Sequence, residues 1–222
     1  MVGTSPNLWP DSPEARTSIG QTMASLDAML EKTDRHTVRH QRRMATLARA
    51  IAVEMGLSEE HVHATHTAAV VHDIGKVCVP AEILSRPGKL SAVEFAIIKV
   101  HPRAGYDILK GIQFPGPVAN IVLQHHERLD GSGYPSGLSC RDILLEARIL
   151  GVADVVEAMA SHRPYRPPRG IGLALEEIWR NAGRLYDART VEVCLHLFAA
   201  KAFEFDRDTD GMEPDPLQQV NT

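Results

Sequence analysis

The chain has 222 residues, which suits one globular domain with short appendages. Its 24 lysines and arginines against 28 aspartates and glutamates give a net charge of −4, which excludes general nucleic-acid binding through a basic surface. Aromatic residues make up 5% of the chain, while alanine, leucine, isoleucine and valine dominate, a mix that favours helix over strand.

Helix signals recur in chain order, and no segment shows the apolar alternation of a half-buried strand. We expect a flexible N-terminus over 1–12, one helical domain over 13–204 and a disordered acidic tail over 205–222. The expected helices cover 13–32, 34–56, 58–72, one short turn between 80 and 88, 91–110, the stretch from 118 to 126, 142–161, 171–183 and 188–204. The sequence therefore predicts an all-α helical bundle.

Capping residues support several of these bounds. Ser58 followed by two glutamates is typical of a helix start, and Gly56 of a helix end. Ser91 and Glu94 have the spacing of a capping box. Pro102 is expected to kink or divide the helix over 91–110 next to His101.

Three cysteines are widely separated and form no CxxC motif, so a disulfide framework or a zinc knuckle is not indicated. The N-terminal residues contain no apolar core of a secretion signal, and no 18-residue apolar run occurs anywhere. We therefore predict a cytoplasmic protein that does not enter the membrane.

Histidine and aspartate pairs point to a metal site. His72 and Asp73 end an apolar segment, and Asp154 lies within another, where a carboxylate is costly unless it is paired or bound to a metal. Any one histidine alone is more often a surface or satisfied core residue. Adjacent histidines such as His125 and His126 differ by about 100° on a helix, so both reach one metal only where the helix ends. The glycine-rich loop over 130–137 predicts such an end, and Gly75 predicts one after His72 and Asp73.

The ligand types limit the metal. Imidazole and carboxylate together suit iron, manganese or zinc, and fit magnesium or calcium poorly. Ligands at helix ends that point into one cleft of a bundle can form a dinuclear centre. His36 and His40 have i, i+4 spacing, so both project from one face of their helix.

Seven short motifs then match one family in order. They are HDIGK at 72–76, PAEIL at 80–84, RPGKLS at 86–91, HP at 101–102, HHERLDGSGYP at 125–135, ARILGVAD at 147–154 and RPYR at 163–166. Over about residues 30–203 the chain resembles the HD-GYP domains, a branch of the HD metal-dependent phosphohydrolases in bacterial second-messenger signalling. The resemblance implies a helical bundle that hydrolyses cyclic di-GMP to linear pGpG, and in some members to GMP.

The resemblance also implies the site. It places two divalent ions, iron or manganese, with Asp73 as the bridging ligand; a third ion is not favoured. The implied ligands are His40, His72, Asp73, His101, His125, His126 and Asp154. Lys76 matches a lysine near the scissile phosphate, Gly133, Tyr134 and Pro135 form one wall of the pocket, and Arg163 and Arg166 contact the nucleotide. Asp73 and Lys76 are thus the expected catalytic residues.

Plainer roles remain open for the outer residues. Lys76 can cap a helix end, Tyr134 can serve packing alone, and Arg163 and Arg166 can be ordinary surface cations. His36 replaces a tyrosine, or the glutamate of members said to hold a third ion, and is an open ligand candidate. His162 replaces an aspartate that commonly precedes the RPYR stretch, and the prolines at 167–168 stiffen its exit.

Alternatives to the main prediction concern substrate and class. One is a phosphodiesterase for another cyclic dinucleotide, such as cyclic GMP-AMP, and the other is a catalytically silent nucleotide-sensing module. The intact ligand set argues against the second. No sensory domain is recognisable, so we expect regulation by a separate protein, a GGDEF-type diguanylate cyclase being one candidate, or a longer parent protein. A homodimer is a further candidate assembly; no membrane or nucleic-acid polymer is expected as a partner.

Overall fold

A computed structural model describes residues 35–86, 88–161 and 170–205. Its helices are α2 (Arg35–Glu54), α3 (Glu59–Val71), η1 (Ile74–Cys78), α4 (Ala81–Leu84), α5 (Ala92–Ile98), α6 (His101–Leu109), α7 (Val118–Gln124), η2 (Cys140–Asp142), α8 (Leu145–Ala160), α9 (Ile171–Arg180) and α10 (Ala188–Ala200). The described residues contain helices and two isolated bridges but no strand, which confirms the all-α prediction.

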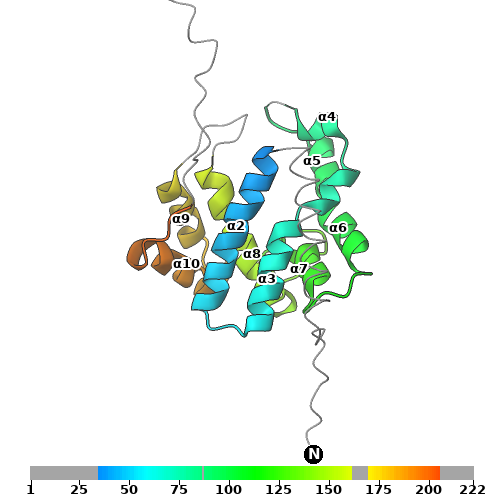
Figure 1. The fold of residues 1–222 in the computed structure, drawn as a ribbon. Coiled ribbons are helices and arrows are strands. Elements are labelled where there is room, and N and C mark those ends of the chain that lie inside the picture. The colour runs from blue at the N-terminus through cyan, green and yellow to red at the C-terminus, as the bar shows by residue number, and fades with distance from the viewer. Residues whose placement is uncertain (1–34, 87, 162–169, 206–222) are drawn as a thin grey trace, which may run out of the picture.

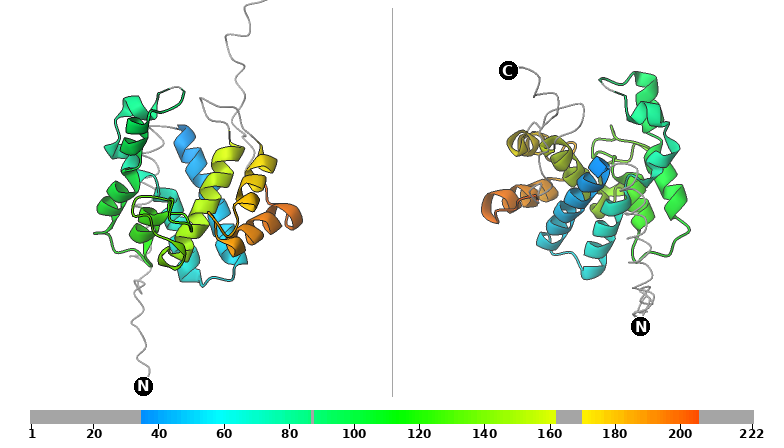
Figure 2. Two further views of the ribbon diagram at one scale, coloured as in Figure 1. Left: turned by 180° about the vertical axis from the view of Figure 1, so that it is seen from behind. Right: turned by 45° about the horizontal axis from the view of Figure 1, so that its top comes forward.

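Helices α2, α3 and α8 form the centre of the bundle. In Figure 1, α2 and α3 lie side by side with α8 behind them, and Figure 2 shows the same arrangement from behind. Met44, Leu47 and Ile51 recur every three or four residues along α2 and are fully buried, as are Ile149 and Leu150 of α8. Each such side chain contributes about 1.5–3 kcal/mol by leaving water. This core fixes the central helices relative to one another.

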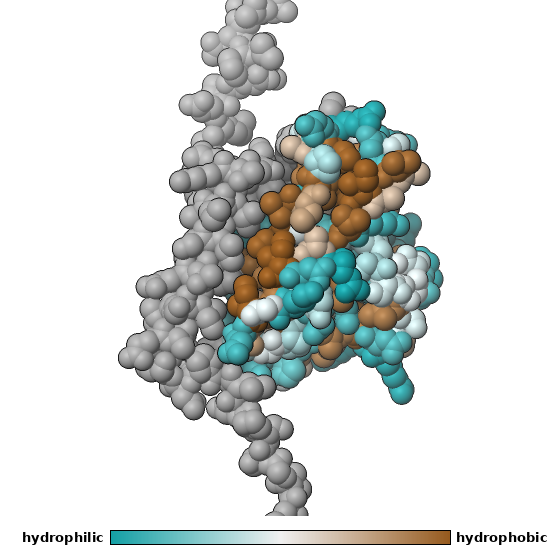
Figure 3. Space-filling view, turned by 90° about the vertical axis from the view of Figure 1, so that its right-hand side faces the viewer, coloured by the Kyte–Doolittle hydropathy of each residue, from teal (hydrophilic) through white to brown (hydrophobic). Residues whose placement is uncertain are grey.

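The remaining helices flank this centre on two sides. Helices α9 and α10 pack on the α2–α8 side, while α6 contacts η1 and α7 on the other. Figure 3 faces the side of α4, α5 and α6, where apolar side chains gather in a diagonal band. Phe95 of α5 is 44% exposed, and Val93, Val100 and Ile108 of the same segments are exposed as well.

Several predicted bounds are correct. Ser58 caps α3 and accepts a hydrogen bond from the His61 amide, and Ser91 and Glu94 form a capping box on α5. Gly56 follows α2 with a φ of +76°, a left-handed conformation that favours glycine. The caps therefore located these ends correctly.

Other bounds were wrong for local reasons. The helix expected over 91–110 is two helices, because the chain turns at Lys99 and Val100; Pro102 then lies in the first turn of α6, where its missing N–H costs nothing. Helix α8 begins at Leu145 rather than at residue 142, after the short 3₁₀ turn η2. Helices α9 and α10 end at Arg180 and Ala200, three and four residues earlier than expected.

The predictions for 13–32 and for the acidic tail over 206–222 lie outside the described residues, so the domain bounds at 13 and 204 stay predictions. None of the described helices is long and apolar enough to cross a membrane. The three cysteines are all in the described part of the chain, and none forms a disulfide.

Candidate metal centre

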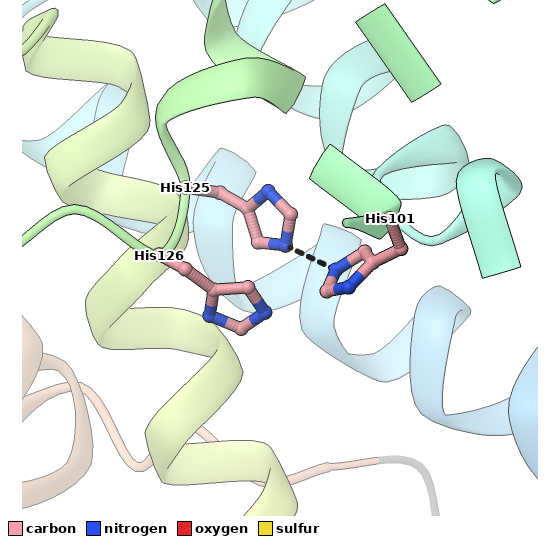
Figure 4. Close-up of side chains that lie close together, drawn as sticks. All are labelled: His101, His125 and His126. Carbon is pink, nitrogen blue, oxygen red and sulfur yellow. Dashed lines mark hydrogen bonds between the residues drawn. The ribbon is translucent and has the colours of Figure 1, made fainter. Parts of the chain in front are cut away.

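Helix ends bring most of the predicted ligands to one place. His72 is the C-cap of α3 with Asp73 directly after it, and His125 is the C-cap of α7 with His126 next. His101 begins α6. Figure 4 shows His101, His125 and His126 pointing toward one another from the start of α6 and the end of α7. The adjacent candidate ligands thus lie at helix ends, as the sequence predicts.

Backbone carbonyls fix the orientation of three imidazoles. The Nδ1 atoms of His72, His101 and His125 lie 2.8, 2.8 and 2.6 Å from the carbonyl oxygens three residues earlier. A carbonyl oxygen only accepts, so each Nδ1 carries a proton and donates. When such a ring is neutral, it presents a lone pair on Nε2, the atom that can then bind a metal.

These lone pairs converge without a donor between them. The Nε2 atoms of His101 and His125 lie 3.4 Å apart. A dashed line joins the two rings in Figure 4. Burial keeps the pKa of His125 well below its usual range, and burial lowers the pKa of His101. Two neutral acceptors that face each other at this distance repel, whereas a cation between them would be attracted to both. The residues therefore fit a bound metal ion.

Two groups of ligand atoms are each compact enough to hold one ion. One group is His101, His125 and His126, and the other is His40, His72 and Asp73. The two carboxylate oxygens of Asp73 lie between the groups: Oδ2 is 3.2 Å from His72 Nε2, and Oδ1 is 3.5 Å from His101 Nε2. A carboxylate in this position can contact an ion in each group. This geometry supports the predicted bridging role.

Helix α8 provides acidic residues on the far side of His40. Asp154 Oδ1 lies 3.4 Å from His40 Nε2, and Glu157, one turn later, contacts His40 Nδ1. Glu157 is 1% exposed, so its carboxylate is committed to this contact and to its other neighbours, Arg43 and Ser161. A carboxylate on the second nitrogen of a ligating histidine orients the ring and increases its basicity.

Sequence reasoning missed Glu157. The available signal was its i, i+3 spacing from Asp154, which places both carboxylates on one face of a helix. That signal becomes useful only when the face is known to contact His40, which is 117 residues away in sequence.

Two carboxylates of the site are ionised, whereas several of its histidines are neutral. Burial disfavours ionisation of Asp73, but nearby His72 and Lys76 outweigh it and hold its pKa well below the usual range. Burial likewise opposes ionisation of Asp154, yet the hydrogen bond with His40 keeps its pKa well below normal. Burial lowers the pKa of His126 to about 3. At neutral pH Asp73 and Asp154 are therefore ionised, while His101, His125 and His126 are neutral, which are the states that metal binding requires.

His40 has a raised pKa, which predicts that it releases a proton when a metal ion binds. Burial opposes its charge, but hydrogen bonds with Asp154 and Glu157 prevail and raise its pKa from 6.5 to about 9 in the metal-free protein. The charged His40 ring stabilises the folded, metal-free protein. This stabilisation is complete below pH 6.5 and is lost as pH rises through about 9. A metal ion must displace this proton, so we expect manganese affinity to increase with pH up to about 9 and then level off.

Isothermal titration calorimetry in two buffers of different ionisation enthalpy counts the protons released. We expect release at pH 7.5 and little at a pH above about 9. Glu157→Gln should reduce the release at pH 7.5, because an amide no longer favours the imidazolium. Equal affinity across this range, with no proton release, would contradict the assignment of His40 as a protonated ligand.

Lys76 forms an ion pair with Asp73. Its Nζ donates to Asp73 Oδ2 at 2.6 Å, and the lysine side chain remains 35% exposed. The ammonium thus lies beside the ligand groups and reaches solvent. Its hydrogen bond goes to this carboxylate and not to a carbonyl at a helix end, as the alternative of helix capping would require. A contact between Lys76 and substrate stays a proposal.

The glycine and tyrosine at 133–134 pack against the same region. A Cβ on Gly133 would lie 2.4 Å from both Arg128 N and Glu127 Cα, so the loop can approach that backbone only with glycine here. The Tyr134 ring lies 4.7 Å from the His126 ring at an angle of 31°, and its amide donates to the His126 carbonyl. Tyr134 therefore does have a packing role, and a role of Tyr134 and Pro135 in substrate binding stays a proposal.

Other predicted residues are not tested. Arg163, Arg166, His162 and the prolines at 167–168 lie outside the described residues. His36 lies on α2 one turn before His40, but its side chain is outside the described part. Two groups of ligand atoms were found among the described side chains.

The chain is similar to known proteins over most of its length. The model of a family described as "HD domain" matches residues 24–190, about three quarters of the chain. The response regulator RpfG of Xanthomonas campestris, named a cyclic di-GMP phosphodiesterase, is 44% identical over 177 residues, which cover 79% of this chain and 47% of RpfG. The 3′3′-cGAMP-specific phosphodiesterase 2 of Vibrio cholerae is 34% identical over 184 residues, which cover 82% of this chain and 35% of that enzyme.

The chain thus spans about half the length of the first relative and about a third of the second. Among solved structures, the HDG"Y"P protein Bd1817 of Bdellovibrio bacteriovorus superposes with a TM-score of 0.59 at 20% identity, covering 72% of this chain and 51% of that one. At this identity the likeness concerns the fold. The two chains therefore share their helical arrangement.

Proposed function

Since the chain belongs to the HD-GYP branch of the HD domain family, we propose that it is a metal-dependent phosphodiesterase that hydrolyses cyclic di-GMP. The observation that carries this proposal is the position of Asp73, whose two oxygens lie between two groups of histidine ligands. We assign Asp73 as the shared ligand. Asp154 completes the group around His40.

Two ions of iron or manganese suit this set of imidazoles and carboxylates. When bound, such a pair supplies Lewis acidity that brings the pKa of a water near 7 and offsets charge on the phosphate. Water adds to phosphorus, the bond from phosphorus to the 3′ oxygen breaks, and that oxygen takes a proton. One such cleavage gives linear pGpG, and a second gives two GMP.

The chain's own residues position the substrate. The Lys76 ammonium lies at the edge of the ligand groups and can donate to a phosphoryl oxygen there. Burial raises the pKa of the Tyr134 hydroxyl, so it stays protonated as a hydrogen-bond donor. Gly133 and Pro135 hold the loop that presents this tyrosine, and we assign Arg163 and Arg166 to the second phosphate or a guanine edge.

The function is tested by combining metal analysis with product chromatography. Protein purified without oxygen and loaded with manganese or iron should contain about two ions per chain and convert cyclic di-GMP to pGpG or GMP. Hydrolysis of cyclic GMP-AMP with cyclic di-GMP left intact would favour the alternative substrate. The similarity to the Vibrio enzyme is the observation that supports this alternative. Tight binding of cyclic di-GMP without turnover would establish the silent module instead. Input from a diguanylate cyclase, a homodimer and a cytoplasmic location remain further predictions.

A further inference from the structure

A line of aromatic rings leads from the ligand groups to the surface. The His125 and His126 rings lie 4.0 Å apart, and the Tyr134 ring is 4.7 Å from that of His126. The Phe95 ring of α5 then meets Tyr134 at 6.3 Å with an interplanar angle of 81°. Because Phe95 is 44% exposed, the line ends in solvent.

A lysine ammonium lies over the outer end of this line. Lys99 Nζ is 4.8 Å from the centre of the Phe95 ring and 5.2 Å from the centre of the Tyr134 ring. No ion pair links Lys99 to a carboxylate within the described residues, whereas Lys76 and Lys110 are each paired with an aspartate. The cation is therefore held by aromatic faces and keeps its donors available.

An exposed aromatic ring and an ammonium with no carboxylate partner among the described residues can together bind a guanine base. Every base can stack on an aromatic side chain, which makes that contact insensitive to sequence. Guanine in addition presents two adjacent acceptors, O6 and N7, to a cationic donor. Adenine replaces O6 with an amino group, itself a donor, so a lysine in this position disfavours it.

We propose that Phe95, Tyr134 and Lys99 form a subsite for one guanine base of the substrate, with Lys99 selecting guanine over adenine. The proposal rests on the proposed function, because the phosphodiester at the metal centre determines where the base lies. The subsite begins one ring beyond His126, and in a nucleotide one ribose separates the base from its phosphate. Phe95 provides the stacking face and Lys99 the donor.

Steady-state kinetics on three substrates test the two roles. For Lys99→Met, kcat/KM for cyclic di-GMP should fall about tenfold relative to that for bis(p-nitrophenyl) phosphate, mainly through KM, while cyclic di-AMP is affected much less. Phe95→Ala should weaken both cyclic dinucleotides about tenfold, because stacking does not discriminate between them. Lys99→Arg should restore the preference for guanine, because a guanidinium also donates to O6 and N7.

Lys110→Met is the matched control, since Lys110 is exposed, lies on the same side of the bundle and pairs with Asp107. It should behave as the unmodified chain. Equal losses on cyclic di-GMP and cyclic di-AMP in Lys99→Met, or no loss on either, would overturn the selection role.

A binding measurement separates this proposal from the proposed function. Metal-depleted protein is titrated with 5′-GMP and 5′-AMP, and we expect GMP to bind more tightly by about tenfold, a difference that Lys99→Met removes. A chain that does not hydrolyse cyclic di-GMP but shows this difference would refute the enzyme activity and keep the subsite. A chain that hydrolyses cyclic di-GMP but binds GMP and AMP equally, with or without Lys99, would refute the subsite alone.

Discussion

Asp73→Asn is expected to reduce hydrolysis of cyclic di-GMP by about a thousandfold or more, because the variant loses the ligand that lies between the two metal groups. Asparagine matches aspartate in size but offers one neutral oxygen in place of two charged ones. Its amide N–H₂ would face the lone pair of His72 or His101, and its carbonyl cannot balance the charge of two ions. Metal content should fall together with activity.

Thermal unfolding provides a second measurement on the same variant. Manganese should raise the melting temperature of the unmodified chain, because an ion that binds only the folded form stabilises it, and this increase should be small in Asp73→Asn. Asp107→Asn is the matched control, since Asp107 is exposed on α6 and pairs only with Lys110 among the described residues. If Asp73→Asn retained full activity with two bound ions, the bridging assignment would be wrong.

The convergence of adjacent candidate ligands could be predicted from the sequence, because it depends on local features. A helix end after His72 and another after His125 could be predicted from the glycines that follow, and these ends decide whether adjacent side chains converge. The convergence of segments far apart in sequence came from the family resemblance. In the structure it results from the contacts of α3 with α2 and α7.

Features that depend on tertiary crossings could not be predicted. In the sequence, only its spacing from Asp154 distinguishes Glu157 from the other acidic residues on helices. Its role becomes visible only in the fold, where α8 lies against His40. The position of Lys99 over Tyr134 requires α5 to lie against the loop that contains Tyr134, which no local pattern encodes. The sequence also gave no sign of η1, because a five-residue 3₁₀ helix lacks a periodic apolar face.

Gly75 shows how such a crossing constrains the site. The sequence predicts that this glycine ends the helix that contains His72, whereas in the structure it lies within η1 and is buried against the first turn of α6. A Cβ on Gly75 would lie 2.0 Å from the carbonyl oxygen of His101 and 2.5 Å from the amide nitrogen of Gly105. Those are backbone atoms, so they cannot move without displacing α6 and the His101 imidazole that it positions.

Gly75→Ala is therefore expected to destabilise the fold by about 4 kcal/mol or more, or to displace α6 with a large loss of metal affinity. Chemical denaturation measures the first effect and manganese titration the second. Gly111→Ala is the control, because a Cβ there meets nothing within 4 Å; its free energy of unfolding should change by less than about 1 kcal/mol. Normal stability and normal manganese affinity in Gly75→Ala would mean that η1 and α6 are not in this close contact. The position of His101 in the metal centre would then need another support, because it depends on the same crossing that brings His72 and Asp73 next to it.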